Sequence, residues 1–183
     1  MLDVYILCNN FFEYLLSLLQ TPIMENKMSR TRGFEVVSKY ADETDKLLVP
    51  RRATKKSACY DVYNNSGEDI VLQPGDISGV ITTKFKSYML DDEVLKAFVR
   101  SGHGFKYSVR LANSTGIIDS DYYNNPKNEG EIFIKLHNQG DKELVIPVGE
   151  AMAQFMFQKY LLADGDSFEN GDDRDGGIGS TSK

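Results

Sequence analysis

From Phe34 onward the chain is made of short apolar or alternating runs separated by turn residues, and no long segment has a helical period. Turn signals occur at Gln73-Pro74-Gly75-Asp76 and Pro147-Val148-Gly149. Short strands at this spacing predict an all-β fold, in which antiparallel strands close into a barrel or a sandwich. The candidate strands are residues 70–72, 79–85, 97–99, 131–136, 143–146 and 152–159.

The length and composition narrow the classes of protein further. A chain of 183 residues accommodates one domain with appendages. Its formal net charge of −6 argues against a nonspecific hold on nucleic acid, which requires clustered cations. Cys8 and Cys59 are too few for a disulfide framework, and no CxxC accompanies His103 or His137. We therefore expect a protein of the reducing cytoplasm.

Residues 1–28 differ from the rest because apolar side chains crowd into the first twenty positions, which predicts a helix. Asp3 lies where a secretory signal carries positive charge, and Asn9 and Glu13 interrupt the run too often for a membrane span. We expect a helical, non-catalytic extension and no membrane partner. In the plainer alternative, the working chain begins at Met24 or Met28.

The carboxyl end combines an acidic, glycine-rich linker with a tail suited to anion binding. Glycines allow backbone N–H groups to approach an anion, and hydroxyls and a guanidinium add donors. A disordered end has the same composition, so the tail alone does not distinguish a phosphate-binding flap from a disordered end. The predicted linker and flap cover residues 164–183, and the flap donors are Arg174, Gly176, Gly177, Gly179, Ser180 and Thr181.

Four further clusters precede the tail, and each suits a nucleotide. Residues 57–62 place Asp61 at the start of a strand. Residues 100–102 offer a guanidinium, a hydroxyl and an unhindered backbone N–H to phosphate oxygens. Residues 113–122 combine an amide, an acid after two branched apolar residues, and an aromatic ring within a segment of hairpin length. Residues 149–154 bring Gln154 into a strand after a glycine turn.

Taken in order, the five clusters resemble the five motifs of the trimeric deoxyuridine triphosphatases (dUTPases). Gly116-Ile117-Ile118-Asp119-Ser120-Asp121-Tyr122 and the Gly-Gly-x-Gly-Ser-Thr tail are the most specific matches, and residues 121–130 look like the form found in Gram-positive bacteria and their phages. The resemblance covers residues 32–183. It implies a β-clip or jelly-roll barrel at residues 32–163, hydrolysis of dUTP to dUMP and pyrophosphate, and a homotrimer whose sites are shared between subunits.

The resemblance also assigns roles to residues. Asp119 is the expected base for the attacking water, flanked by Ile117 and Ile118, which would limit its hydration. Mg²⁺ is expected to arrive with the triphosphate, with Asp61 contacting it through water. The expected base and sugar contacts are Asn113, Gly116, Ile117, Ile118 and Tyr122. The expected phosphate contacts are Arg100, Ser101, Gly102, Gln154, Arg174, Gly179, Ser180 and Thr181, under a lid of Gly176, Gly177 and Ile178.

Some positions depart from the family pattern and some alternatives stay open. Ile178 replaces the phenylalanine that stacks on uracil in most relatives, and Ala151 replaces a usual basic residue. Asp119 could instead cap a turn and Asp61 could hold a loop. Tyr122 could be an ordinary core residue. Two other functions remain: deamination of dCTP by the same fold, and a dUTP-dependent regulatory protein that sequesters a partner such as a phage repressor.

Overall fold

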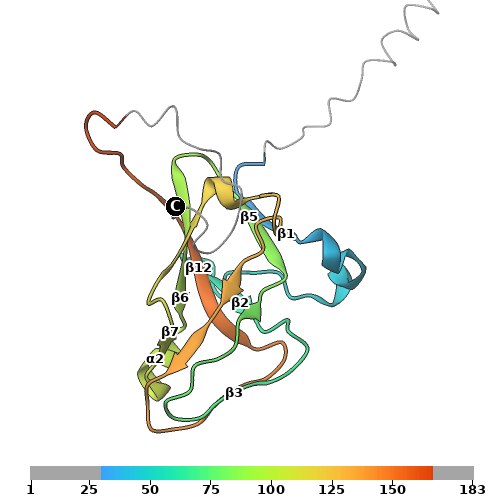
Figure 1. The fold of residues 1–183 in the computed structure, drawn as a ribbon, viewed down its shortest axis with the longest axis vertical. Helices are drawn as coiled ribbons and strands as arrows, with labels where there is room; N and C mark the ends of the chain where they lie inside the picture. The colour runs from blue at the N-terminus through green and yellow to red at the C-terminus, as the bar shows by residue number, and fades with distance from the viewer. Residues whose placement is uncertain (1–29, 167–183) are drawn as a thin grey trace, which may run out of the picture. The chain divides into compact units, whose positions relative to one another are not determined.

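The computed structural model describes residues 30–166 (Figure 1). The predicted N-terminal helix and the flap lie outside the described residues, and the domain boundaries 1–28, 32–163 and 164–183 stay predictions. The all-β fold class is confirmed, with strands far outnumbering helices. The strands are β1 Gly33–Val36, β2 Tyr60–Tyr63, β3 Ile70–Leu72, β4 Ile81–Thr82, β5 Phe85–Tyr88, β6 Glu93–Val99, β7 Val109–Leu111, β8 Gly116–Asp119, β9 Phe133–Ile134, β10 Leu136–Asn138, β11 Leu144–Ile146 and β12 Ala151–Lys159; the helices are α2 Ser101–Tyr107 and the 3₁₀ segments η1 Ser38–Lys46 and η2 Ser120–Tyr122.

A four-stranded antiparallel sheet in the order β2-β12-β6-β8 organises the molecule. Four two-stranded pairs accompany it: β1–β5, β3–β11, β4–β9 and β7–β10. Figure 1 shows β12 as the long orange strand beside β6. Because side chains alternate between the faces of a strand, each strand of this sheet sends one set inward and one set outward.

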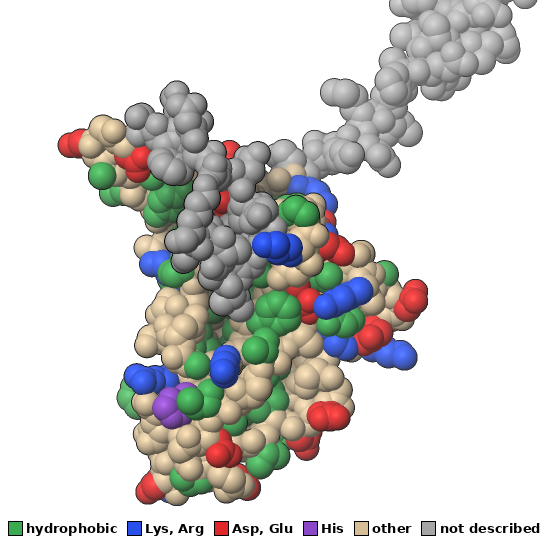
Figure 2. Space-filling model, viewed as in Figure 1, with side chains coloured by type: hydrophobic (Ala, Val, Ile, Leu, Met, Phe, Trp, Pro, Cys, Tyr) green, Lys and Arg blue, Asp and Glu red, His purple; other side chains and the backbone are tan. Residues whose placement is uncertain are grey.

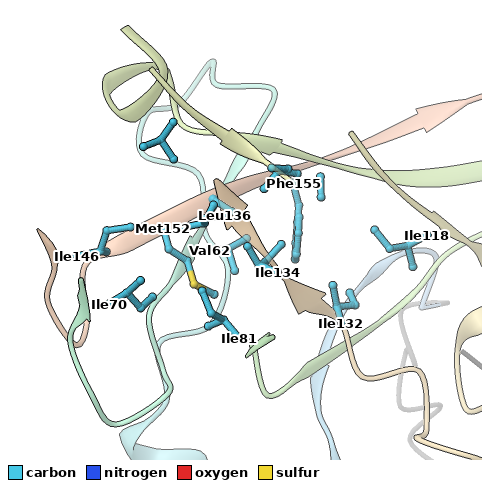
Figure 3. Packing of buried hydrophobic residues seen from close by; sticks show 14 of the residues in the cluster. Val62, Ile70, Ile81, Ile118, Ile132, Ile134, Leu136, Ile146, Met152 and Phe155 are labelled. Atoms are coloured by element: carbon cyan, nitrogen blue, oxygen red, sulfur yellow. The ribbon is translucent and has the colours of Figure 1, made fainter. Parts of the chain in front are cut away.

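The core gathers the inward-facing side chains of the four-stranded sheet and of the strand pairs. Figure 3 shows Ile70 and Ile146 at one end of this cluster and Ile118 and Ile132 at the other. Phe155 of β12 is completely buried. Burial of so many branched and aromatic side chains is the main stabilising term for a domain of this size.

Two expected strands are each broken in two. Residues 79–85 divide into β4 and β5, because Lys84 has a left-handed backbone with φ +65° and a strand cannot continue through it. Residues 131–136 divide into β9 and β10, which pair with β4 and β7. Between them the carbonyl of Lys135 accepts a hydrogen bond from Ala112 N at 2.8 Å. Ile132, Ile134 and Leu136 of this run are buried.

Helix α2 was not expected from the sequence, and the acidic residues 91–93 form no helical turn. Gly102 and Gly104 lower the helix propensity of α2, which hides it from a propensity argument. Ser108, with φ +54°, ends the helix and donates its N–H to the carbonyl of Gly104. Glu93 instead begins β6. None of the helices within residues 30–166 is long and apolar enough to cross a membrane.

Candidate active site

Three of the expected site residues meet at one end of the four-stranded sheet. Asp61 on β2 lies directly opposite Gln154 on β12. Arg100 follows the last residue of β6, and its Nε lies 3.3 Å from Asp61 Oδ1. Arg100 Nη1 also donates to the carbonyl of Ala151 at 3.4 Å, and Gln154 Nε2 donates to the carbonyl of Val99 at 2.9 Å. The fold therefore brings together residues from the first, second and fourth clusters.

Ser101 and Gly102 extend this group into the first turn of α2, where both are exposed. A Cβ added at Gly102 would meet nothing within 4 Å, so the space beside its backbone is open. A guanidinium, a hydroxyl and an accessible backbone N–H next to one another can bind the oxygens of a phosphate. We call Arg100, Ser101, Gly102 and Gln154, with Asp61 behind Arg100, the phosphate end of the sheet.

Asp61 contacts Arg100 in the single chain, and its expected contact with Mg²⁺ through water stays a prediction. Its side chain is only 15% exposed and lies against the Arg100 guanidinium, whose positive charge would repel a cation placed on the same carboxylate. Residues 30–166 contain no group of three or more His, Cys, Asp or Glu side chains able to hold a metal ion. The described residues therefore do not fit a protein-held Mg²⁺, and the observed contact of Asp61 is with Arg100.

His103 lies on α2 beside Arg100, and its Nδ1 is buried without a hydrogen-bond partner among the described residues. Burial, and then the positive charge of Arg100, hold the pKa of His103 below its ordinary value of 6.5. The imidazole is therefore neutral at pH 7. A neutral ring adds no charge to the phosphate end.

The third cluster lies on β8, where alternation separates its residues between two faces. Ile118 packs into the core, while Asp119 and Ile117 lie on the exposed face. Ile117 is 57% exposed in the single chain, and the expectation that both isoleucines limit the hydration of Asp119 stays a prediction. Ile118 anchors the strand from inside, which fixes the backbone that carries Asp119.

Gly116 is required by packing. A Cβ at this position would lie 2.9 Å from the Cβ of Ala97, its partner on β6. Asn113 lies in the exposed turn before β8, and its carbonyl accepts a hydrogen bond from Thr115 N at 2.8 Å. The segment has the length of a hairpin, but β7 pairs with β10 and β8 with β6, so it links two sheets.

Tyr122 has the buried position that its structural reading anticipated. The side chain belongs to the core, with 8% of the residue exposed. Its hydroxyl donates to the carbonyl of Glu131 at 2.9 Å and accepts from Asn128 Nδ2 at 2.8 Å. These contacts fix the ring, and its expected role against a deoxyribose stays a prediction.

The strand register places Asp119 far from the phosphate end within one chain. Asp119 lies opposite Val94 at the start of β6, whereas Arg100 follows the end of β6. Six residue steps along an extended strand span about 20 Å. That separation greatly exceeds the few ångströms over which a base and a phosphate contact act on one reacting group.

The outer face of the sheet between these two ends is partly apolar. Phe98 lies opposite Gln154, and the next row across the sheet is Met156, Lys96 and Ile117. Phe98, Lys96 and Met156 are half-buried in the single chain. We call Phe98, Met156, Lys96 and Ile117 the outer sheet face.

Sequence reasoning overlooked the segment that precedes Asp61. Arg51 forms an antiparallel bridge with Asp61, which fastens a basic loop to the phosphate end. The signal was present in the sequence as four cations within residues 51–56. The seven expected tail residues, by contrast, lie outside the described residues: Arg174, Gly176, Gly177, Ile178, Gly179, Ser180 and Thr181.

Comparisons with known proteins find a matching family model and several relatives. The family model described as dUTPase matches residues 45–182. The deoxyuridine 5'-triphosphate nucleotidohydrolase of Lactococcus lactis is 43% identical over 152 residues, which cover 83% of this chain and 98% of that protein. The enzyme of the same name from Actinobacillus succinogenes is 32% identical over 74% of this chain and 87% of its own length.

Solved structures show the same fold. The crystal structure of a dUTPase from Streptococcus mutans is 41% identical, with a TM-score of 0.61 over 73% of this chain and 99% of that one. A mutant dUTPase from phage phi11 of S. aureus is 20% identical, with a TM-score of 0.56 over 75% of this chain and 95% of its own. That work describes a structural Mg(II) ion in the phage protein, and at this identity the likeness extends to the fold alone.

Proposed function

The chain belongs to the dUTPase family, and from that premise we propose that it hydrolyses dUTP to dUMP and pyrophosphate. The observation that carries the proposal is the division of one sheet into a phosphate end and an end bearing Asp119. A nucleotide triphosphatase needs both parts, because phosphate oxygens require donors and the attacking water requires a base.

Asp119 is the proposed base. The water oxygen attacks the α-phosphorus while a proton passes to the Asp119 carboxylate. The bond from the α-phosphorus to the bridging oxygen breaks, and pyrophosphate leaves with the electron pair. The exposed face of β8 leaves Asp119 accessible, while the buried Ile118 and the close approach at Gly116 hold its backbone.

The phosphate end supplies the donors. Arg100, Ser101, Gly102 and Gln154 would bind the phosphates nearest the reacting bond, where the developing charge is greatest. Asp61 orients the Arg100 guanidinium through their 3.3 Å contact. Mg²⁺ would be held by the triphosphate itself and would neutralise phosphate charge when bound. In the tail, Arg174, Gly179, Ser180 and Thr181 would close over the outer phosphates.

Base and sugar recognition are proposed on the segment from Asn113 to Tyr122. Asn113 and the backbone of residues 116–118 would read the uracil edge, since a wrong base leaves buried polar groups unpaired at about 1–3 kcal/mol each. Tyr122, held by Glu131 and Asn128, would exclude a 2′-hydroxyl.

Sharing of sites among subunits would account for the separation within one chain. A base about 20 Å from the phosphate contacts cannot act on the same nucleotide, given strand steps of about 3.3 Å. If the outer sheet face docks a second copy, Asp119 of one chain can meet Arg100 of another. A closed ring of such contacts gives every site one residue of each kind, and we propose a homotrimer.

A substrate panel tests the proposal. Purified protein should release pyrophosphate from dUTP and much less from dTTP, dCTP or UTP. Ammonia release from dCTP would point instead to a deaminase, and binding of dUTP without pyrophosphate release would point to a regulatory protein. Either result would overturn the assignment of dUTP hydrolysis.

A further inference from the structure

Residues 51–57, which we call the basic loop, carry a charge opposite to that of the whole chain. Arg51, Arg52, Lys55 and Lys56 fall within six positions that contain no acid, in a chain of net charge −6. On the face drawn in Figure 2, Lys and Arg are interspersed with Asp and Glu. Attraction of a polyanion to this chain therefore has to come from local groups of cations.

The basic loop is fastened to the phosphate end through its first residue. Arg51 N donates to the carbonyl of Asp61 at 3.2 Å, and Asp61 N donates to the carbonyl of Arg51 at 2.8 Å. The Arg51 side chain is also fixed, because Nε donates to the Tyr63 hydroxyl at 2.9 Å and the guanidinium lies 5.6 Å from the ring centroid. The backbone of Asp61 thus binds the loop, and the side chain of Asp61 contacts Arg100.

Internal hydrogen bonds hold the rest of the basic loop in one conformation. Arg52 Nη1 donates to the carbonyl of Lys55 at 3.1 Å and lies 3.4 Å from the carbonyl of Ser57. The hydroxyls of Thr54 and Ser57 are 2.7 Å apart, and Ser57 N donates to the carbonyl of Thr54 at 3.2 Å. The side chains that hold the turn are therefore those of Arg52, Thr54 and Ser57, and the side chains of Lys55 and Lys56 take no part in it.

Lys55 and Lys56 are left with exposed side chains that form no ion pair with any residue from 30 to 166. Lys39, Lys84, Lys86 and Lys159, by contrast, each pair with a carboxylate. Two unpaired ammonium groups on a loop joined to the phosphate end can bind an anion without first breaking an ion pair.

We propose that the basic loop is an additional phosphate-binding element, in which Lys55 and Lys56 capture the polyphosphate end of an incoming nucleotide. This inference rests on the proposed function, because the loop would deliver to Arg100 and Gln154 the phosphates that they then bind. The ligand class is a linear polyphosphate, free or attached to a nucleoside. Capture by ammonium groups raises the association rate and lowers KM, and it leaves the chemical step to Asp119.

The experiment compares two double variants of equal charge. Lys55→Gln/Lys56→Gln removes the two ammonium groups, and Lys135→Gln/Lys142→Gln removes two exposed lysines elsewhere. Calorimetry measures binding of inorganic tripolyphosphate at low and high salt, and initial rates give kcat and KM for dUTP. Thermal unfolding of all proteins checks that each variant is folded.

At low salt, the loop variant should bind tripolyphosphate about 5- to 20-fold more weakly and show a similar rise in KM, with a smaller salt dependence and little change in kcat. The matched control should change each value less than about twofold. Equal behaviour of the two variants, or a loss confined to kcat, would overturn the inference. If wild-type protein bound tripolyphosphate through the loop but cleaved no dUTP, the proposed function would fail while the loop assignment stood.

Discussion

At the scale of single residues, neighbouring residues of β8 have opposite environments. Ile118 is buried in the core and Asp119 is exposed, because successive side chains of a strand point to opposite faces. Gly116 keeps β8 close to β6, where any larger residue would meet the Cβ of Ala97 at 2.9 Å. The position of the proposed base is therefore set by two residues that do no chemistry.

Replacing Gly116 with alanine should test this dependence. The added methyl forces β8 away from β6, so we expect Gly116→Ala to lower the free energy of unfolding by about 1–3 kcal/mol and to lower turnover as Asp119 moves. Gly102→Ala is the matched control, because a Cβ there meets nothing within 4 Å. Its stability should stay equal or rise slightly. Urea unfolding of both variants measures the difference, and equal stabilities would refute the packing role of Gly116.

At the scale of elements, β6 connects the two ends of the site. It pairs with β12 on one side and with β8 on the other, and it leads into Arg100. Its first residue, Glu93, is buried and held by Arg32, whose Nε lies 3.0 and 2.9 Å from the two carboxylate oxygens. Leu90 N donates to the same carboxylate at 3.2 Å. The start of β6 is thus fixed by a charged contact.

This contact predicts a stability that depends on pH. The hydrogen bond from Arg32 holds the pKa of Glu93 below its ordinary value of 4.5. A lowered folded-state pKa stabilises the protein above pH 4.5, and that stabilisation is lost as the pH falls through the folded-state value. Glu93→Gln should therefore lower Tm at pH 7, and the difference from wild type should shrink as the pH falls below 4.5 and through the lowered pKa. A difference that did not depend on pH would contradict this account.

Alternation and turn residues were sufficient to predict where most strands run. They could not predict the break at Lys84, because it depends on Thr83, whose hydroxyl donates to the carbonyl of Ile132 at 2.8 Å, 49 residues away. They also gave no sign that Glu131 is buried. That carboxylate is 1% exposed and is satisfied by Lys39 at 2.6 Å and the Tyr40 hydroxyl at 3.0 Å, both from η1.

The grouping of three candidate residues was predictable from the sequence, and their geometry was not. The sequence grouped Asp61, Arg100 and Gln154 by their resemblance to family motifs, and the structure places them together. The pairing of Asp61 with Arg100 depends on which strands are neighbours, and the distance to Asp119 depends on their register. Neither can be read from composition or spacing.

At the scale of the whole molecule, we propose that one chain carries two halves of different sites. Asp119 and the phosphate end lie about 20 Å apart along one sheet, with the partly apolar outer sheet face between them. Association of copies through this face would unite the two halves, so activity should belong to the oligomer and not to the monomer.

Complementation between inactive variants tests this claim most directly. Asp119→Asn removes the base and Arg100→Gln removes a phosphate contact, so each protein alone should lose about 100-fold or more of its turnover. When equal amounts are unfolded and refolded together, sites that draw Asp119 from one chain and Arg100 from another should recover about one quarter of wild-type activity, by random assembly in a closed ring. A mixture no more active than the separate variants would contradict the sharing of sites between chains.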